Sequence, residues 1–253
     1  MTTSSGQNYL AIPGPSVIPD EVLRSMHRAA PNIYEGELIE ITESLIQDLN
    51  YVARSSGKVA MYIANGHGIW EAALSNMVSK GDYILVIATG RFAYGWAEIA
   101  KRMEIKIDIV DFGKNTALDV ETVSEKLLSE PKNKYKAILL TQVDTSTSVK
   151  NDIASLRKKL TEIECLSLLA VDCIASLACD RFEMDKWGVD IMVAACQKGL
   201  MVPPGMGFVF FNHRAEERQR ELKNVSLYWD WEPRVNPSRY YEYFCGTAPT
   251  HHI

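Results

Sequence analysis

The run Asp190-Ile-Met-Val-Ala-Ala-Cys-Gln-Lys198-Gly-Leu-Met-Val-Pro-Pro-Gly205 decides the fold. Its first half is a short apolar segment, which is typical of a strand that is buried on both faces of a sheet. Lys198 follows this segment directly, and the glycine and proline residues after it predict a turn. A second apolar segment, residues 166–171, ends in the same way at Asp172. The two segments predict an α/β fold in which reactive side chains follow buried strands.

A lysine and a carboxylate at neighbouring strand ends are the two protein groups that pyridoxal phosphate most needs. The amine of the lysine forms a Schiff base with this cofactor, and the carboxylate holds the protonated pyridine nitrogen. Lys198 and Asp172 fit these two roles. The positive charge of the ring would depress the pKa of Asp172 and keep its carboxylate ionised. Alone, each residue has an ordinary explanation as a surface lysine or a strand-end cap, so the prediction depends on the pair.

Apolar strand patterns alternate with helical patterns along the rest of the chain. This alternation predicts a three-layer α/β/α domain around a mainly parallel sheet of seven strands. We expect an N-terminal arm over residues 1–20, because the Pro13-Gly14-Pro15 segment is incompatible with a helix interior. Residues 21–253 then form one large domain. The expected strands cover residues 59–64, 83–88, 105–110, 137–141, 166–172, 191–196 and 207–211, and the expected helices start at a cap on Asp20 and cover residues 36–53, 69–80, 94–103, 119–129 and 152–164.

The composition indicates a globular protein without a nucleic-acid or membrane surface. The chain has 253 residues and a formal net charge of −5, which disfavours binding to polyanions. No segment approaches the roughly 18 apolar residues that a membrane span needs, and the N-terminus lacks a signal-peptide pattern. The five cysteines are odd in number and form no Cys-x-x-Cys pair. They predict reduced, packed thiols in a cytoplasmic protein, with no metal site.

Three further motifs follow predicted strands. Gly66 and His67 lie between a strand and a helix, where backbone amides favour a phosphate, although taken alone they are more simply explained by an ordinary tight turn. Phe92 follows the next strand and has the flat shape that stacks on a heterocycle, or that simply packs in a core. Residues 141–148 are rich in hydroxyl side chains, which either contact a cofactor or cap the helix near Asn151. Because strand ends converge in an open α/β sheet, we expect these motifs to meet Lys198.

These residues together give the chain a resemblance to the class V aminotransferases of pyridoxal-phosphate fold type I. Within that class it is most like the serine–glyoxylate and alanine–glyoxylate aminotransferases. The resemblance runs from Pro13 to the last residue and is strongest over residues 171–176, 187–190 and 197–205. It implies the large domain of fold type I. The family carries a small C-terminal domain with an arginine for the substrate carboxylate, and we expect this chain to stop before that domain.

The resemblance also implies roles for individual residues. Lys198 would carry the internal aldimine and then move the proton from the substrate Cα, and Asp172 would bind the pyridine nitrogen. Thr247 would contact the phosphate in the neighbouring subunit, which implies a homodimer with shared active sites. The other implied contacts are Phe92 and Ile174 on the two sides of the ring, Gly66, His67 and Gln197 at the phosphate, Thr145 near the ring hydroxyl, and Asn8, Tyr9 and the residue 13–15 arm at the substrate mouth.

By this resemblance the chain is a transaminase with small substrates. It would move the amino group of serine or alanine to a 2-oxo acid such as glyoxylate or pyruvate. Two alternatives stay open: another pyridoxal-phosphate reaction, such as that of a lyase, a desulfurase or a pyridoxamine transaminase, or a truncated and inactive cofactor-binding fragment. A desulfurase needs a mobile nucleophilic cysteine, and none of the five cysteines has that character. The sequence does not decide among alanine, serine and aspartate as donors.

Overall fold

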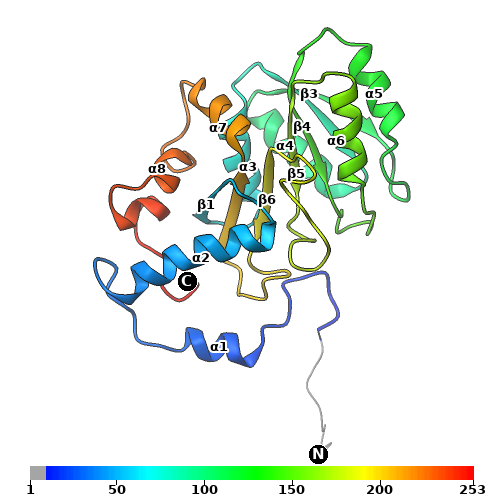
Figure 1. The fold of residues 1–253 in the computed structure, drawn as a ribbon. Helices are drawn as coiled ribbons and strands as arrows, with labels where there is room; N and C mark the ends of the chain where they lie inside the picture. Colours follow the sequence, from blue (N-terminus) through cyan, green and yellow to red (C-terminus); the bar gives the residue numbers. More distant parts are fainter. Residues whose placement is uncertain (1–9) are drawn as a thin grey trace, which may run out of the picture.

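The computed structural model describes residues 10–253 and is built around one sheet. The strands are β1 (Lys58–Ile63), β2 (Tyr83–Ala88), β3 (Lys106–Asp111), β4 (Tyr135–Thr141), β5 (Leu168–Asp172), β6 (Ile191–Ala195) and β7 (Met206–Phe211). They lie in the order β1-β7-β6-β5-β4-β2-β3 (Figure 1). β7 is antiparallel to both of its neighbours, and the remaining pairs are parallel. Six strands therefore share one direction, which confirms the predicted mainly parallel seven-stranded sheet.

Helices cover both faces of the sheet and complete three layers (Figure 1). The helices are α1 (Asp20–Met26), α2 (Glu37–Ala53), α3 (Gly66–Met77), α4 (Arg91–Arg102), α5 (Val120–Leu128), α6 (Ile153–Glu162), α7 (His213–Arg220) and α8 (Glu232–Val235), followed by the short 3-10 helix η1 (Tyr240–Phe244). One apolar core contains Leu49 of α2 and Leu156 of α6. The other contains Trp70 of α3 and Trp96 of α4. Each face of the sheet is therefore buried by its own helices, as the continuous apolar strands require.

The predicted strands agree with the structure to within two residues, but three helix starts were wrong. α3 and α4 each begin three residues earlier than the apolar pattern indicated. The side chain of Asn65 accepts hydrogen bonds from the first turn of α3, and Asp144 accepts one from the amide of Phe92 in α4. These contacts stabilise a first turn that has no apolar periodicity. Asp20 is the first residue of α1, not its cap, and Pro19 holds the cap position.

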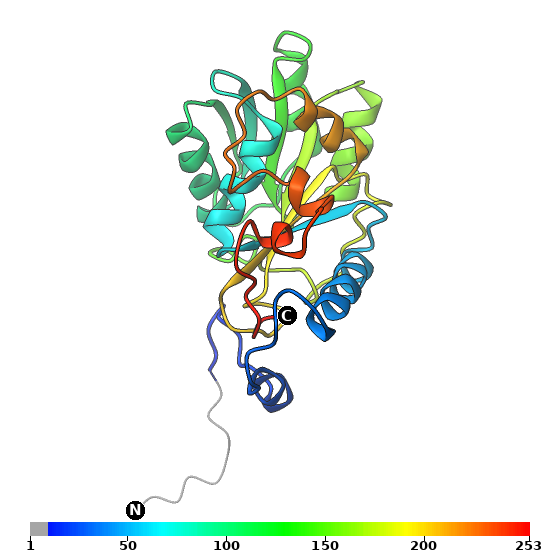
Figure 2. The same ribbon diagram turned by 90° about the vertical axis from the view of Figure 1, so that its left-hand side faces the viewer.

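The two ends of the described chain lie at the same end of the molecule (Figure 2). Residues 10–19 form an arm without helix or strand, and α1 after it buries none of its residues. A guanidinium nitrogen of Arg28 donates to the carbonyl oxygen of Thr250 at 2.7 Å, which ties the segment after α1 to the C-terminal residues. Residues 1–9 of the predicted arm lie outside the described part. No helix within residues 10–253 has the length and apolar character needed to cross a membrane.

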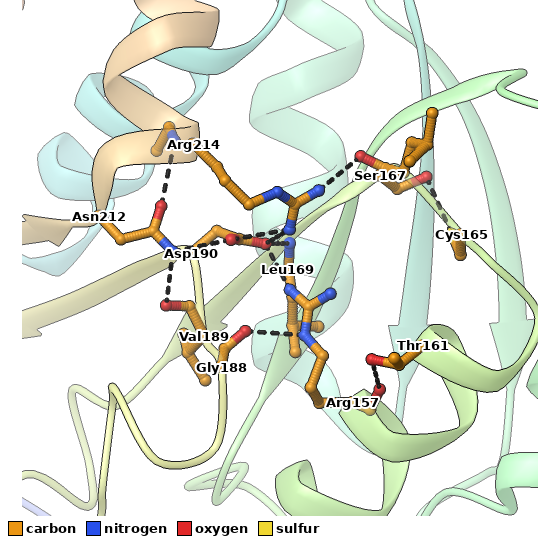
Figure 3. Close-up of polar contacts among 12 residues, drawn as sticks. Arg157, Thr161, Cys165, Ser167, Leu169, Gly188, Val189, Asp190, Asn212 and Arg214 are labelled. Carbon is orange, nitrogen blue, oxygen red and sulfur yellow. Dashed lines mark hydrogen bonds and ion pairs between the residues drawn. The ribbon is translucent and has the colours of Figure 1, made fainter.

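A buried ion cluster holds the opposite end of the sheet together (Figure 3). Asp190 immediately precedes β6 and is 1% exposed. Its carboxylate pairs with Arg157 of α6 and Arg214 of α7, helices that lie on opposite faces. It also accepts hydrogen bonds from the amide of Leu169 at 2.8 Å and the side chain of Asn212 at 2.8 Å. One buried charge thus links two strands with the helices on both sides of the sheet.

We expect Asp190→Ala to lower the free energy of unfolding by about 3 kcal/mol, because breaking a buried pair leaves charges without compensation. Urea denaturation monitored by circular dichroism measures this change. Glu98→Ala is the matched control, since Glu98 pairs with Arg102 on an exposed helix surface and its loss costs under about 0.5 kcal/mol. Equal losses for the two variants would contradict the role of the cluster.

Candidate functional site

Residues that follow the parallel strands border one cavity of ≈ 320 Å³. The cavity lies at the carboxyl edge of the sheet, which is where open α/β sheets bind ligands. Its volume falls within the usual range for small-molecule sites. The sequence-predicted site residues that line it are Gly66, His67, Phe92, Thr145, Asp172, Ile174, Gln197 and Lys198.

Lys198 lies three residues beyond β6 and is held by the N-terminal arm. Its Nζ donates a hydrogen bond to the carbonyl oxygen of Pro13 at 2.6 Å. The hydroxyl of Ser16 donates to the carbonyl oxygen of Lys198 at 2.9 Å, so the arm fixes both ends of the lysine. Gly14 has a φ of +135°, and a Cβ there would lie 2.6 Å from the lysine side chain. Only glycine therefore allows the arm to lie this close to Lys198.

The carboxylate of Asp172 is the buried charge of the cavity. Asp172 ends β5 and is 5% exposed. One oxygen accepts the amide of Ile174 at 2.7 Å and the other accepts the indole N–H of Trp70 at 2.9 Å. Burial raises the pKa of Asp172 to about 7, although both hydrogen bonds act in the opposite direction. Burial also lowers the pKa of Lys198, which increases the neutral fraction of its amine.

The N-terminus of α3 forms the opposite wall of the cavity. Gly66 is its first residue, and a Cβ at this position would lie 2.6 Å from the tip of Ile174. The Oδ1 of Asn65 accepts the amides of His67 at 3.1 Å and Gly68 at 3.3 Å. A phosphate at this helix end would therefore share the amides of the first turn with Asn65 or replace its side chain.

The loop after β4 contacts the start of α4, which carries Phe92, and does not cap α6. Asp144 is fully buried, and its carboxylate accepts the amide of Phe92 at 2.8 Å and the amide of Ser146 at 2.9 Å. The hydroxyl of Thr147 donates to the carbonyl of Thr89 at 3.0 Å. Asp152 caps α6, so the alternative that the hydroxyl residues cap this helix was wrong. The loop leaves Thr145 at the cavity.

Some predictions for the site differ from the structure or fall outside it. Thr247 is exposed and does not line the cavity of its own chain, so its contact with the neighbouring subunit's phosphate stays a prediction. Asn8 and Tyr9 lie outside the described residues, while Gly14 of the same arm does line the cavity. The expectation of packed thiols was correct only in part. Cys173 and Cys196 are buried, Cys165 and Cys245 are partly exposed, and Cys179 is exposed.

Three functional features were missed by the sequence analysis. Trp70 reads as an apolar helix residue, yet it donates to Asp172. Asn65 carried the signal of a helix cap, which the glycines beside it obscured. The contact of Asp144 with the start of α4 joins residues 52 positions apart, so no local pattern indicates it.

The side chains at the cavity fit pyridoxal phosphate. The Oε1 of Gln197 is buried and has no hydrogen-bond partner among the described residues, so it can accept a bond from a ligand. Asp172 supplies an acceptor for a protonated ring nitrogen, and Lys198 supplies the amine. The start of α3 supplies amides for a phosphate. The three chemical groups that this cofactor requires therefore border the same space.

The raised pKa of Asp172 makes the stability of the cofactor-free protein dependent on pH. The pKa of Asp172 is about 7 in the folded protein and has its ordinary value of 3.8 in the unfolded chain. At a pH between these two values, folding therefore takes up a proton. The free energy of unfolding should therefore fall as the pH rises from about 4 to about 7. We expect Asp172→Asn to remove this dependence, because an amide side chain takes up no proton in this pH range.

Urea titrations of the cofactor-free protein between about pH 5 and about pH 8 measure this difference. Asp48→Asn changes an exposed aspartate of α2 and should leave the pH profile as it is in the wild type. The same pH profile for the wild type and Asp172→Asn would contradict the buried, proton-binding carboxylate.

Comparison with known proteins gives relatives over nearly the whole chain. The family model of Aminotransferase class-V matches residues 9–230. The serine–glyoxylate aminotransferase of Arabidopsis thaliana is 31% identical over 227 residues, which are 89% of this chain and 57% of the relative. The L-aspartate–glyoxylate aminotransferase of Paracoccus denitrificans is 30% identical over 227 residues, with the same coverage of both chains.

The solved structures agree with the sequence relatives. An aspartate aminotransferase of subgroup IV from Thermus thermophilus superposes with a TM-score of 0.86 at 26% identity, over 97% of this chain and 67% of that chain. The present chain spans 57% of the length of the two curated relatives above. The matched residues 9–230 include the cavity and the strands that build it. The chain therefore belongs to the class V aminotransferases, a family whose cofactor is pyridoxal phosphate.

Proposed function

We propose that this chain catalyses the pyridoxal-phosphate-dependent transfer of an amino group from a small amino acid, serine or alanine, to a 2-oxo acid such as glyoxylate or pyruvate. The observation that carries the proposal is the pairing of Lys198 with the buried Asp172 in one cavity. The names of the serine–glyoxylate and aspartate–glyoxylate relatives support amino transfer to glyoxylate. They also keep aspartate as a donor to be tested.

In this proposal each residue at the cavity has a defined task. Asp172 holds the ring nitrogen, and the first turn of α3 holds the phosphate together with the side-chain N–H of Gln197, which donates to a phosphate oxygen. The bound cofactor withdraws electrons from the substrate and makes its Cα proton acidic. The Nζ of Lys198 accepts that proton, because burial lowers its pKa and leaves more of it neutral. Phe92 and Ile174 enclose the ring from its two sides, and Thr145 reaches the ring hydroxyl.

We expect the purified chain, supplied with pyridoxal phosphate, to develop a visible absorption band that borohydride reduction removes. Lys198→Ala should not fix the cofactor under the same reduction, since it lacks the amine. Lys186→Ala is the control, because Lys186 is an exposed lysine that does not line the cavity. Mass spectrometry of the reduced protein then locates the cofactor on a single peptide.

Substrate assays separate transamination from its alternatives. Serine, alanine and aspartate are each supplied with glyoxylate, and formation of glycine and the matching keto acid supports the proposal. Release of ammonia or sulfide without keto-acid exchange would assign a lyase or desulfurase reaction instead. Absence of any cofactor uptake would refute the site, and uptake without turnover would support a cofactor-binding fragment.

A homodimer with shared sites is part of the same proposal. Leu227 is 77% exposed and Ile63 is 42% exposed, although both are apolar. Tyr228 joins them, since its hydroxyl donates to the carbonyl of Ile63 at 3.1 Å. Cys245 contacts the carbonyl of Leu227, and the exposed Thr247 follows Cys245 by two positions. A second copy that covers this surface would receive Thr247 near its own cavity.

Mixing two variants, each with a different defect in the site, tests the shared site. We expect Thr247→Ala to bind the cofactor about tenfold more weakly, because the phosphate loses one hydrogen bond. A mixed dimer of Thr247→Ala with Lys198→Ala contains one site with an intact lysine and an intact partner threonine. Cofactor affinity should therefore recover in the mixture. No recovery, or a monomer by analytical ultracentrifugation, would contradict the shared site.

We also propose a cytoplasmic location. All five cysteines are free thiols, which is typical of a protein from a reducing compartment. Fractionation of cells that produce the chain, followed by immunoblotting, tests this location.

A further inference from the structure

Trp70 lies at the centre of the contacts that surround the cavity. It belongs to α3, is 1% exposed, and donates its indole N–H to the Oδ2 of Asp172 at 2.9 Å. The other oxygen of this carboxylate accepts the amide of Ile174 at 2.7 Å. Each carboxylate oxygen therefore has one donor from the protein, and each keeps a lone pair for a ligand.

The rings next to Trp70 belong to other residues of the cavity wall. Its ring meets the ring of His67 edge-on, with 4.8 Å between centroids, and the ring of Phe92 edge-on at 6.1 Å. Gly66, the first residue of α3, stands four positions earlier, which is about one helical turn. The same rigid helix thus carries the anion-binding turn and the donor to Asp172.

We propose that Trp70 is a positioning residue, whose indole N–H keeps the carboxylate of Asp172 ionised and aimed at the cofactor ring nitrogen. Its place one turn below the start of α3 also fixes the separation between that carboxylate and the phosphate end of the site. This inference rests on the proposed function for the identity of the ring, while the coupling between Trp70 and Asp172 belongs to the chain alone.

The charges around Asp172 show why this donor matters. Burial and the neighbouring Asp144 raise its pKa, and Lys198, the amide of Ile174 and the indole of Trp70 lower it. The thiol of Cys173 is also close, and burial raises the pKa of that thiol so that it stays neutral. Removal of the indole N–H takes away one of the three influences that lower the pKa of Asp172. Burial and Asp144 then favour the protonated, neutral carboxyl more strongly. A neutral carboxyl no longer attracts the ring proton.

Trp70→Phe tests the inference, because it keeps an aromatic ring and removes the N–H. Titration of the Asp172 carboxyl in the cofactor-free protein, followed by carbon NMR, should show a midpoint about one unit higher than in the wild type. Binding of pyridoxal phosphate at pH 7.5 should weaken about threefold, because the ionised fraction of the carboxyl falls by that factor when its pKa rises from about 7 by one unit. The signal of a ¹⁵N-labelled cofactor should shift toward the unprotonated ring.

Trp96→Phe is the matched control. The ring of Trp96 stacks on Trp70, with 6.1 Å between centroids, and its N–H donates to the backbone carbonyl of Trp70 at 3.3 Å. Trp96→Phe removes an indole N–H from the same aromatic cluster, but this N–H does not contact Asp172. The titration midpoint of Asp172 in this variant should therefore match that of the wild type. Equal midpoints in Trp70→Phe and the wild type, or equal shifts in the two variants, would overturn the inference.

A second measurement avoids any variant of Trp70. In the wild type without cofactor, the indole ¹H–¹⁵N signal of Trp70 should move with pH as Asp172 titrates, and Asp172→Asn should abolish the movement. The signal of Trp96 in the same spectrum should stay constant. Absence of the Trp70 movement would overturn the coupling. A wild type that never takes up pyridoxal phosphate would instead refute the proposed function, since the titration requires no cofactor.

Discussion

The common direction of β1, β2, β4, β5 and β6 is the constraint on which the site depends. A parallel register brings the ends of these strands to one edge, so residues that are far apart in the sequence become neighbours. Asp172 and Lys198 meet only because β5 and β6 are parallel and adjacent. A single antiparallel strand, β7, then carries the chain back and closes the sheet against β1 without disturbing that edge.

Two buried aspartates at opposite ends of β5 and β6 illustrate the difference between structure and function. Asp190 is surrounded by two arginines and two further donors, so its charge is compensated within the protein. Asp172 has two neutral donors, and Lys198 is the cation that lowers its pKa. Its raised pKa is a cost of folding that a cationic ring nitrogen would remove. The missing compensation therefore indicates a ligand with a positive charge at this position.

The sequence predicts those parts of the fold and site that depend on local patterns. Buried strands appear as apolar runs, and Lys198 and Asp172 were identified because each lies at or shortly after the end of such a run. The starts of α3 and α4 were wrong because their first turns contain glycine or polar residues, and because these turns depend on side-chain acceptors, Asn65 for α3 and the distant Asp144 for α4. Asp144 acts across 52 positions, so only the folded chain shows it. Trp70 has the spacing of a core residue, and its polar N–H leaves no periodic signal.

The arm adds a constraint that neither the sheet nor its helices impose. The carbonyl of Pro13 accepts a hydrogen bond from the amine of Lys198, and the hydroxyl of Ser16 contacts the backbone carbonyl oxygens of Gln197 and Lys198. The lysine is therefore held by a segment about 185 positions away, at a point where Gly14 leaves no room for any larger residue.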